Sequence, residues 1–322
     1  MTNADRIALI FSLVAIVVTF MIADRVYENI SHIEDEIAYV WQAQAIAQGH
    51  LTLPSPPNPK NFLVPFVVDY NGQRFGKYPL GWPALLAVGI RLGLRQLVNP
   101  LLAGLGVWLT YRLGKKVFGE TVGLLSAGLT LSSPFFLMNS GTLLSHPFGL
   151  VLSTAFALAW IDAFGDNSYS ERKLPLLVAA LSLGVLALTR PFSAIALALP
   201  FGLHGIYLLV RGDWQTRRQV VAVGVTSALV ASLYFLWQYA VTGDPLISPY
   251  TLWWPYDKVG FGPGYGVTES GHNLSLARIN TKFSLWVGWR DLFGWAGYSW
   301  IFLPFGLAAV IIRRNWQGLL AG

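Results

Sequence analysis

The sequence IALIFSLVAIVVTFMIA (residues 7–23) is followed, after a short mixed stretch, by SHIEDEIAY (residues 31–39). The first stretch is apolar enough to anchor the chain in a bilayer. The second places three consecutive carboxylates, Glu34, Asp35 and Glu36, directly beyond that anchor. Because carboxylates are costly near a membrane, a cluster of them at this place needs an explanation. We interpret it as a site for chemistry at the membrane surface.

A helix over residues 31–48 would divide this segment into two faces. The apolar face would hold Ile33, Ile37, Val40 and Trp41, and the opposite face would hold Asp35, Tyr39 and Gln42. Such a helix, lying in the membrane interface, would bury its isoleucines and turn Asp35 toward an aqueous cavity.

Part of the acidic cluster also has a structural explanation. Ser31 and Glu34 fit a capping box, in which each side chain bonds a backbone amide of the first helical turn. Acidic residues in a first turn also complement the helix dipole. Capping accounts for Glu34 and leaves Asp35 unexplained, so we regard Glu34 as structural and Asp35 as functional.

The composition is that of a membrane protein. Apolar residues make up 54% of the chain and charged residues 12%, whereas a soluble domain has about 25% charged residues. The mean hydropathy is +0.51. The chain has no cysteine, which excludes disulfides, thiolate nucleophiles and thiolate metal sites. Its net charge of +6 comes from basic residues at the ends of apolar runs, so we expect no nucleic-acid partner.

Eight apolar runs are candidate membrane spans. They cover residues 7–23, 97–113, 119–138, 147–164, 174–189, 191–210, 219–240 and 297–312. Residues 79–94 are also apolar, but they are short and contain Pro83 and Arg91, so we expect a second interfacial helix there. The sequence therefore predicts an all-α polytopic membrane protein in which residues 1–322 form one transmembrane domain.

The basic residues predict the orientation of these spans. They gather in four short connections, at residues 112–116, at Arg172 and Lys173, at residues 211–218 and at residues 313–314. The positive-inside rule places these connections and the N-terminus in the cytoplasm. Residues 24–96, 141–146 and 241–296 then lie on the outer face of the plasma (inner) membrane. The first of these segments contains a proline-rich stretch at residues 53–60, which is typical of an extended connector.

The sequence carries no nucleotide-binding motif. It has no P-loop, and the glycine string at residues 260–266 contains a proline and opens no clear helix. We therefore expect an activated substrate drawn from the membrane, such as a polyprenyl-phosphate sugar. Phosphate is a good leaving group, so the reaction needs one carboxylate to deprotonate the acceptor hydroxyl. It also needs a cation to neutralise the departing phosphate.

Several short motifs follow one another in the order of a known family. After the first span come Asp35-Glu-x-x-Tyr39, Lys77-Tyr-Pro-Leu80, a span ending at residues 111–119, Ser133-Pro-Phe-Phe136 and Ser145-His-Pro147. Over residues 5–200 the chain resembles the GT-C superfamily of membrane glycosyltransferases. It is most similar to the protein O-mannosyltransferase and aminoarabinose-transferase branch, which depends on phospholipid-carrier donors.

The resemblance implies a GT-C-like helix bundle and an inverting sugar transfer on the outer face. In that reading Asp35 is the general base, with Glu36 beside it in the catalytic group, and Lys77 meets the donor phosphate. His146 stands where the branch has a second acidic residue, and this departure weakens the case for a two-carboxylate metal site. A histidine can still bind a divalent metal ion.

Other candidates rest on the residues themselves. Arg190, at the outer end of two spans, is costly there unless it meets a phosphate, a headgroup or water. Glu269 and His272 form a polar cluster in the second predicted outer loop, and Tyr39 is a separate candidate site residue. The predicted outer histidines and the carboxylates near them also suggest a site for a divalent metal ion. Simpler explanations are that Lys77 reaches toward the interface, that His146 caps a helix, and that the cluster at Glu269 is a solvated loop.

Two other function classes fit parts of the sequence. A lipid-linked sugar transporter would place ionisable residues in the middle of its spans, and here these middles are almost free of charge. A non-catalytic membrane subunit that assembles with a protein partner would keep the same fold. The chain also stops at Gly322, just after the start of another apolar run. This ending predicts a truncated form of a longer protein.

Overall fold

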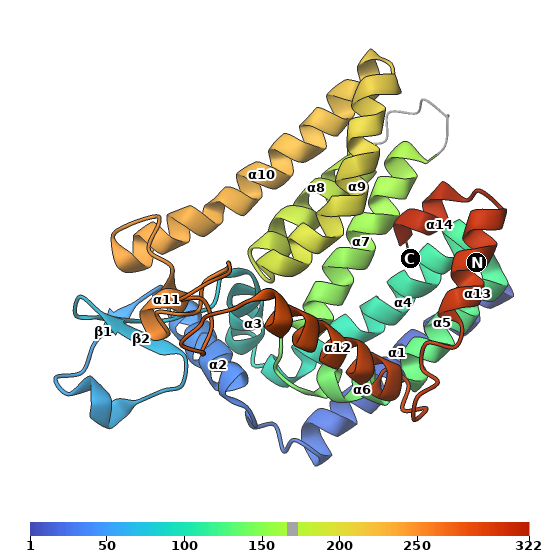
Figure 1. Cartoon of the computed structure of the whole chain (residues 1–322). Helices are drawn as coiled ribbons and strands as arrows, with labels where there is room; N and C mark the ends of the chain where they lie inside the picture. The colour runs from blue at the N-terminus through green and yellow to red at the C-terminus, as the bar shows by residue number, and fades with distance from the viewer. Residues whose placement is uncertain (166–172, 322) are drawn as a thin grey trace.

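The computed structural model describes residues 1–165 and 173–321 (Figure 1). The helices are α1 (Asn3–Arg25), α2 (Glu34–Ala47), α3 (Gly81–Arg91), α4 (Val98–Phe118), α5 (Glu120–Ser132), α6 (Pro134–Gly141), α7 (His146–Phe164), α8 (Lys173–Ala187), α9 (Pro191–Arg211), α10 (Trp214–Thr242), α11 (Pro249–Trp253), α12 (Leu274–Asp291), α13 (Leu303–Ile312) and α14 (Trp316–Ala321). The strands are β1 (Leu53–Pro54), β2 (Val67–Tyr70) and β3 (Gln73–Gly76). Two sequence predictions, the basic connection at Arg172 and the chain end at Gly322, concern residues outside this described part.

The chain is a helical integral membrane protein, as predicted, but the count of eight spans is not reached. Within the described residues, four helices are long and apolar enough to cross a membrane, namely α1, α7, α9 and α10. The pair α5 and α6 makes a fifth only if it counts as one span, because it bends by 60°. Pro134 causes the bend, since it opens α6 and keeps Ser133 extended.

The other predicted spans do not form helices that are both long and apolar enough to cross a membrane, for reasons that the helix bounds show. α8 has 15 residues and α13 has 10, which are too few to cross a bilayer as straight helices. α4 has 21 residues, but Asn99, Arg112 and two lysines lower its hydropathy. Counting apolar runs in the sequence therefore overestimates the number of spans, because such a count does not detect where a helix ends.

α4 is the central helix of the bundle and packs against α1, α5 and α7. Glycines allow this close packing, as is common between membrane helices. A Cβ atom on Gly104 would lie 2.5 Å from the Ile16 side chain of α1, and one on Gly114 would lie 2.9 Å from the Cα of Gly123 in α5. Near the first turn of α1, Lys115 pairs with Asp5 at 2.8 Å. The glycine contacts and this ion pair fix α1 and α5 against α4.

Residues 24–96, which we call the first outer segment after their predicted location, fold into a unit of two helices and a three-stranded antiparallel sheet in the order β1-β3-β2. The sheet was not predicted, and β1 lies in the stretch that we expected to be a connector. Asn71 and Gly72 join β2 to β3, both with positive φ, which is the signature of a type I′ hairpin turn. Arg74 holds the hairpin through two bonds to Asp69, at 2.7 and 2.8 Å.

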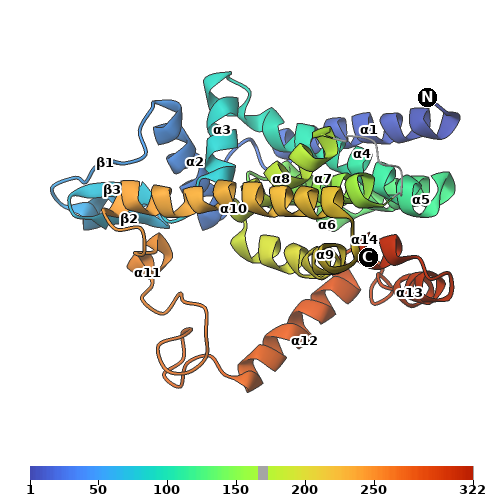
Figure 2. The same ribbon diagram turned by 90° about the horizontal axis from the view of Figure 1, so that it is seen from above.

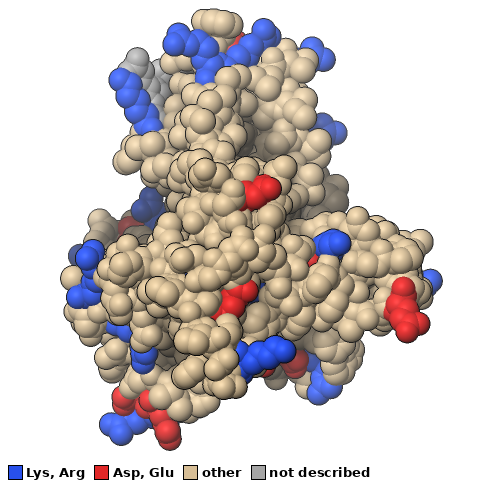
Figure 3. All heavy atoms as spheres, turned by 90° about the vertical axis from the view of Figure 1, so that its left-hand side faces the viewer, with Lys and Arg blue, Asp and Glu red and all other residues tan. Residues whose placement is uncertain are grey.

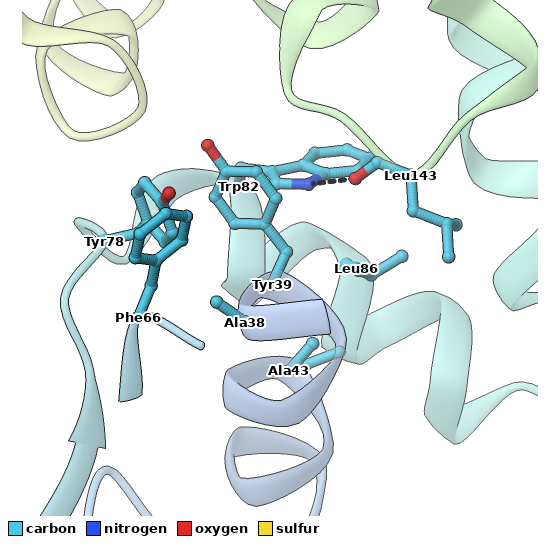
Figure 4. Close-up of a cluster of buried hydrophobic side chains, with 9 residues drawn as sticks. Ala38, Tyr39, Ala43, Phe66, Tyr78, Trp82, Leu86 and Leu143 are labelled. Carbon is cyan, nitrogen blue, oxygen red and sulfur yellow. Dashed lines mark hydrogen bonds between the residues drawn. The ribbon is translucent and has the colours of Figure 1, made fainter. Parts of the chain in front are cut away.

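A buried apolar cluster joins this unit to the bundle (Figure 4). Trp82 of α3 is fully buried, and its indole N–H donates to the carbonyl of Leu143 at 2.9 Å. Asn99 of α4 donates to the carbonyls of Thr142 and Leu144, at 2.6 and 2.9 Å. The loop between α6 and α7 is therefore fixed from both sides, which sets the position of the first residues of α7.

The start of α2 differs from the prediction in one respect. Its N-cap is Ile33, without a side-chain cap bond, so the predicted capping box between Ser31 and Glu34 does not form. Ile33 and Ile37 are exposed on the surface of the chain, whereas Tyr39 and the face around it are buried against α3. The residues share faces as predicted, and the face carrying Tyr39 packs on the protein.

Residues 241–296, which we likewise call the second outer segment after their predicted location, are less tightly packed. α12 projects away from the bundle, and none of its residues is buried (Figure 2). The space-filling view of the end of the molecule that carries the sheet shows broad surfaces almost without charge (Figure 3). Basic side chains gather at the tip between α9 and α10, where Arg211, Arg217 and Arg218 are exposed. Such a distribution is typical of a protein surrounded by lipid.

Candidate functional site

Asp35, in the first turn of α2, accepts a hydrogen bond from the hydroxyl of Tyr78. Tyr78 is held in place by its own neighbours. Its ring packs on that of Tyr39 with 4.4 Å between centroids, and its carbonyl accepts a bond of 2.9 Å from Gln42. Gly76 permits this approach, because a Cβ atom there would lie 2.5 Å from the Gln42 side-chain oxygen. These contacts next to the sheet thus hold the Tyr78 hydroxyl against the Asp35 carboxylate.

Burial keeps this hydroxyl protonated. It raises the pKa of Tyr78 far above the ordinary value of a tyrosine, and the neighbouring Asp35 raises it further. Burial also raises the pKa of Tyr39. At neutral pH both phenols therefore act as neutral hydrogen-bonding groups. Asp35, which is only half-buried, keeps access to the surroundings.

A second polar group lies next to the two tyrosines, at the start of two helices. Arg190 precedes α9 and donates to the Ser145 hydroxyl at 3.1 Å and to Ser193 at 3.4 Å. Ser145 precedes α7 and lies 3.5 Å from the Tyr39 hydroxyl. Gly149 leaves room for the arginine, because a Cβ atom there would lie 3.0 Å from the Arg190 Cδ. The positive ends of two helix dipoles therefore meet beside a guanidinium.

These groups line a hollow of about 220 Å³. Its polar atoms come from Tyr39, Tyr78, Ser145, Thr189, Arg190 and Ser193. Among the described residues, no carboxylate forms an ion pair with Arg190. Helix N-termini and an unpaired arginine together favour an anion, and phosphate is the anion that they most often bind in proteins.

An apolar groove of about 850 Å³ lies next to this hollow. The two cavities share Pro191, Phe192 and Tyr250, and the groove continues between α8, α9 and α10. A further apolar hollow of about 390 Å³ follows along α9 and α10 and shares Leu183 and Ala198 with the groove. The hollow around Arg190 thus adjoins a series of apolar cavities along the helices.

Lys77 lies close to this site but does not line the hollow. It is 4% exposed, and its ammonium contacts the rings of Tyr78 and Tyr250, both of which do line it. Asp257, from the second outer segment, lies 3.8 Å from the ammonium. Burial lowers the pKa of Lys77, and Asp257 and Asp35 partly offset that effect.

Glu36 is buried away from the hollow, at 2% exposure. Its carboxylate accepts bonds from two backbone amides, those of His32 at 3.3 Å and of Leu143. Burial raises its pKa, and the two amides partly offset that rise. In this structure Glu36 therefore connects the start of α2 to the loop that carries Ser145.

The fold has known relatives among solved structures, although sequence comparison finds none. No protein-family model matches the chain, and no curated protein matches it. A crystal structure of an oligosaccharyltransferase from Archaeoglobus fulgidus, in complex with Zn and sulfate, superposes with a TM-score of 0.55 at 14% sequence identity. The match covers 96% of this chain and 44% of the archaeal chain. The chain therefore shares its fold with part of the archaeal enzyme.

Among the described residues, the histidines do not form a metal site with the carboxylates. Across residues 1–165 and 173–321, no three histidine, aspartate or glutamate side chains come together as metal ligands. His146 is exposed at the start of α7, near enough to Arg190 and Asp35 to interact with their charges. His272 contacts the ring of Phe261 at 5.2 Å, and Glu269 is exposed in the same segment. The predicted ligands do not fit together, so we derive no step through a metal ion.

The structure adds site residues to which sequence reasoning gave no role. Tyr78 and Ser145 lie within motifs that we recognised, but only the folded chain shows that they bond Asp35 and Arg190. Tyr250 and Asp257 come from the second outer segment, and only tertiary contacts reveal them. An aromatic-rich sequence at residues 250–256 was the one available signal.

Proposed function

We propose that the protein is a glycosyltransferase that moves a sugar from a polyprenyl-phosphate donor to an acceptor hydroxyl, with inversion. One observation carries the proposal: the hollow at Arg190 adjoins an apolar groove and shares three lining residues with it. A polyprenyl phosphate has the same two parts, an anionic head and a long apolar tail. The GT-C-like fold and the carboxylate beside the hollow support a transferase rather than a simple lipid-binding protein.

In this mechanism each group has a defined task. Arg190 and the starts of α7 and α9 bind the phosphate, and the groove between α8, α9 and α10 holds the tail. Asp35 takes the proton of the acceptor hydroxyl, whose oxygen attacks the anomeric carbon as the bond to the phosphate oxygen breaks. The carrier leaves as polyprenyl phosphate, and its charge remains stabilised by Arg190. Before the acceptor arrives, the Tyr78 hydroxyl occupies the hydrogen-bonding position at Asp35.

The finer assignments made from the sequence belong to the same proposal. The donor specificity would be that of the protein O-mannosyltransferase and aminoarabinose-transferase branch, with the site on the outer face of the plasma membrane. Lys77 would contact the donor phosphate once the contacts around it rearrange. Glu36 would act by fixing the loop before α7, since it is buried and bonded to backbone amides.

Binding and transfer of defined lipids test the function. We expect purified protein in nanodiscs to bind undecaprenyl or dolichyl phosphate and to release it from a matching polyprenyl-phosphate sugar in the presence of an acceptor. Native mass spectrometry measures the first event, and chromatography of radiolabelled donors of several sugars measures the second. The corresponding polyprenol, which lacks the phosphate, serves as the control. Equal binding of polyprenol and polyprenyl phosphate would contradict the assigned anion site.

The orientation can be tested independently. We expect Ser270→Cys to react with a membrane-impermeant maleimide in intact cells and Gln215→Cys to react only after permeabilisation. Both positions are exposed, and the chain has no native cysteine to react instead. The reverse pattern would place the site on the cytoplasmic face.

A further inference from the structure

The ammonium of Lys77 lies in a cage of four aromatic rings. Its distance to the ring centroids is 3.9 Å for Phe66, 4.4 Å for Trp254, 5.1 Å for Tyr250 and 5.4 Å for Tyr78. All four lie within the range over which a ring attracts a cation. Phe66 and Tyr78 belong to the first outer segment, and Tyr250 and Trp254 belong to the second. The cage therefore closes only when the two segments are together.

Asp257 completes the cage with a loose ionic contact. Its carboxylate oxygen lies 3.8 Å from the Lys77 ammonium, whereas a charge-assisted bond is about 2.7–2.9 Å long. The side chain of Asp257 is 39% exposed, and that of Lys77 is 5% exposed. Asp257 would thus return to water at little cost, but the buried lysine needs an anion beside it.

The same segment forms one wall of the apolar groove. Tyr250, Asp257 and Lys258 all line it, opposite α8 and α9. The Asp257 amide donates to the Trp254 carbonyl at 2.9 Å, so the carboxylate and the caged tryptophan move as one turn. Holding Asp257 on Lys77 therefore holds this wall in place.

We propose that Lys77 and Asp257 form a latch that keeps residues 249–258 against the first outer segment, and that the phosphate of an incoming lipid carrier replaces Asp257 on Lys77. The phosphate can approach more closely than 3.8 Å and offers several acceptor oxygens. The rings keep the ammonium in place during the exchange. Once Asp257 is released, the wall of the groove can move aside and admit the tail. The identity of the carrier rests on the proposed function, whereas the latch itself does not.

Trypsin cleavage after Lys258 reports whether the latch is closed, because this exposed residue directly follows Asp257. Cleavage of a folded segment follows the population of its open form. We expect Asp257→Asn to speed this cleavage about two- to fivefold in nanodiscs without lipid carrier, the upper range for an ion pair with one exposed partner. Mass spectrometry of the cleaved peptides gives the rate, with cleavage after the exposed Lys60 as the internal reference. Glu269→Gln is the control. It removes a carboxylate from the second outer segment but outside residues 249–258, and it should leave the cleavage rate unchanged.

Adding a lipid carrier tests the exchange. Undecaprenyl phosphate should speed cleavage after Lys258 in the wild type, whereas undecaprenol should not, and Asp257→Asn should respond to neither. If undecaprenol acts equally, the tail and not the phosphate opens the wall, and the exchange is wrong. An unchanged rate for Asp257→Asn without lipid would remove the latch, even if sugar transfer is found. Conversely, the expected cleavage pattern without any transfer would leave the latch standing and overturn the transferase.

Discussion

Asp35→Asn should lower the rate of sugar transfer by a factor of about 10² to 10⁴, the usual cost of losing a general base. Asparagine keeps the size of the side chain and can still accept a bond from Tyr78, so the fold and the donor site should remain intact. The loss should therefore appear in the rate of transfer and not in the affinity for polyprenyl phosphate. Single-turnover transfer from a bound donor, followed by chromatography of the released carrier, measures it.

Glu34→Gln provides the matched control. Glu34 lies in the same helical turn, is exposed and carries the same charge. It contacts neither Tyr78 nor the hollow in the described structure. Its substitution should change transfer by less than about threefold, because removing an exposed charge alters a nearby interaction by only a few tenths of a kcal/mol. Equal losses in the two variants, or near wild-type transfer by Asp35→Asn, would remove Asp35 from the role of base.

The elements that depend on local sequence could be predicted. Hydropathy alone predicts α1, since no charged residue lies between Ile7 and Ala23. The helices α2 and α3 lie within the ranges 31–48 and 79–94 that periodicity and length indicated. The prediction of a helical membrane protein is confirmed, and the chain shares its fold with part of an archaeal oligosaccharyltransferase. The order of the motifs is informative because each motif is expected at one particular end of a predicted span.

The elements that depend on where helices stop were harder to predict. Hydropathy treated residues 119–138 as one span, but Pro134 divides them into two helices. The strands β2 and β3 have four residues each, too few for a clear alternation of polar and apolar side chains. The Asn71-Gly72 pair was nevertheless a recognised hairpin signal, so this part of the fold could have been found from the sequence.

The residues of the site also fall into two groups, those whose proximity the sequence predicts and those that only the fold brings together. Asp35 and Tyr39 share a helical face, which a helical wheel shows directly. The contact between Arg190 and Ser145 joins the starts of two helices that are 45 residues apart, and that between Lys77 and Asp257 joins two outer segments. Pairings of this kind follow from packing alone. The sequence could therefore propose the charged residues but not which of them share the hollow.

The hollow favours Arg190 as the main phosphate contact, and its removal should weaken donor binding strongly. Arg190→Met keeps an apolar stem of similar length and removes the guanidinium, which faces no carboxylate among the residues that the structure describes. A hydrogen bond to a charged group contributes about 1.5–3 kcal/mol. The dissociation constant for undecaprenyl phosphate should therefore rise roughly ten- to hundredfold. Titration in nanodiscs, followed by native mass spectrometry, gives this constant.

Two comparisons separate a phosphate role from a structural one. Arg278→Met removes an equally basic side chain from the exposed face of α12, and it should leave binding unchanged. Arg190→Lys keeps the charge but loses the forked geometry that bonds Ser145 and Ser193, so it should recover part of the affinity. If Arg190 only held α7 and α9 together, Arg190→Met would lower the melting temperature and weaken binding of undecaprenol and undecaprenyl phosphate alike. We expect instead that the loss is confined to the phosphorylated lipid, because the tail binds in the groove between α8, α9 and α10, which Arg190 does not line.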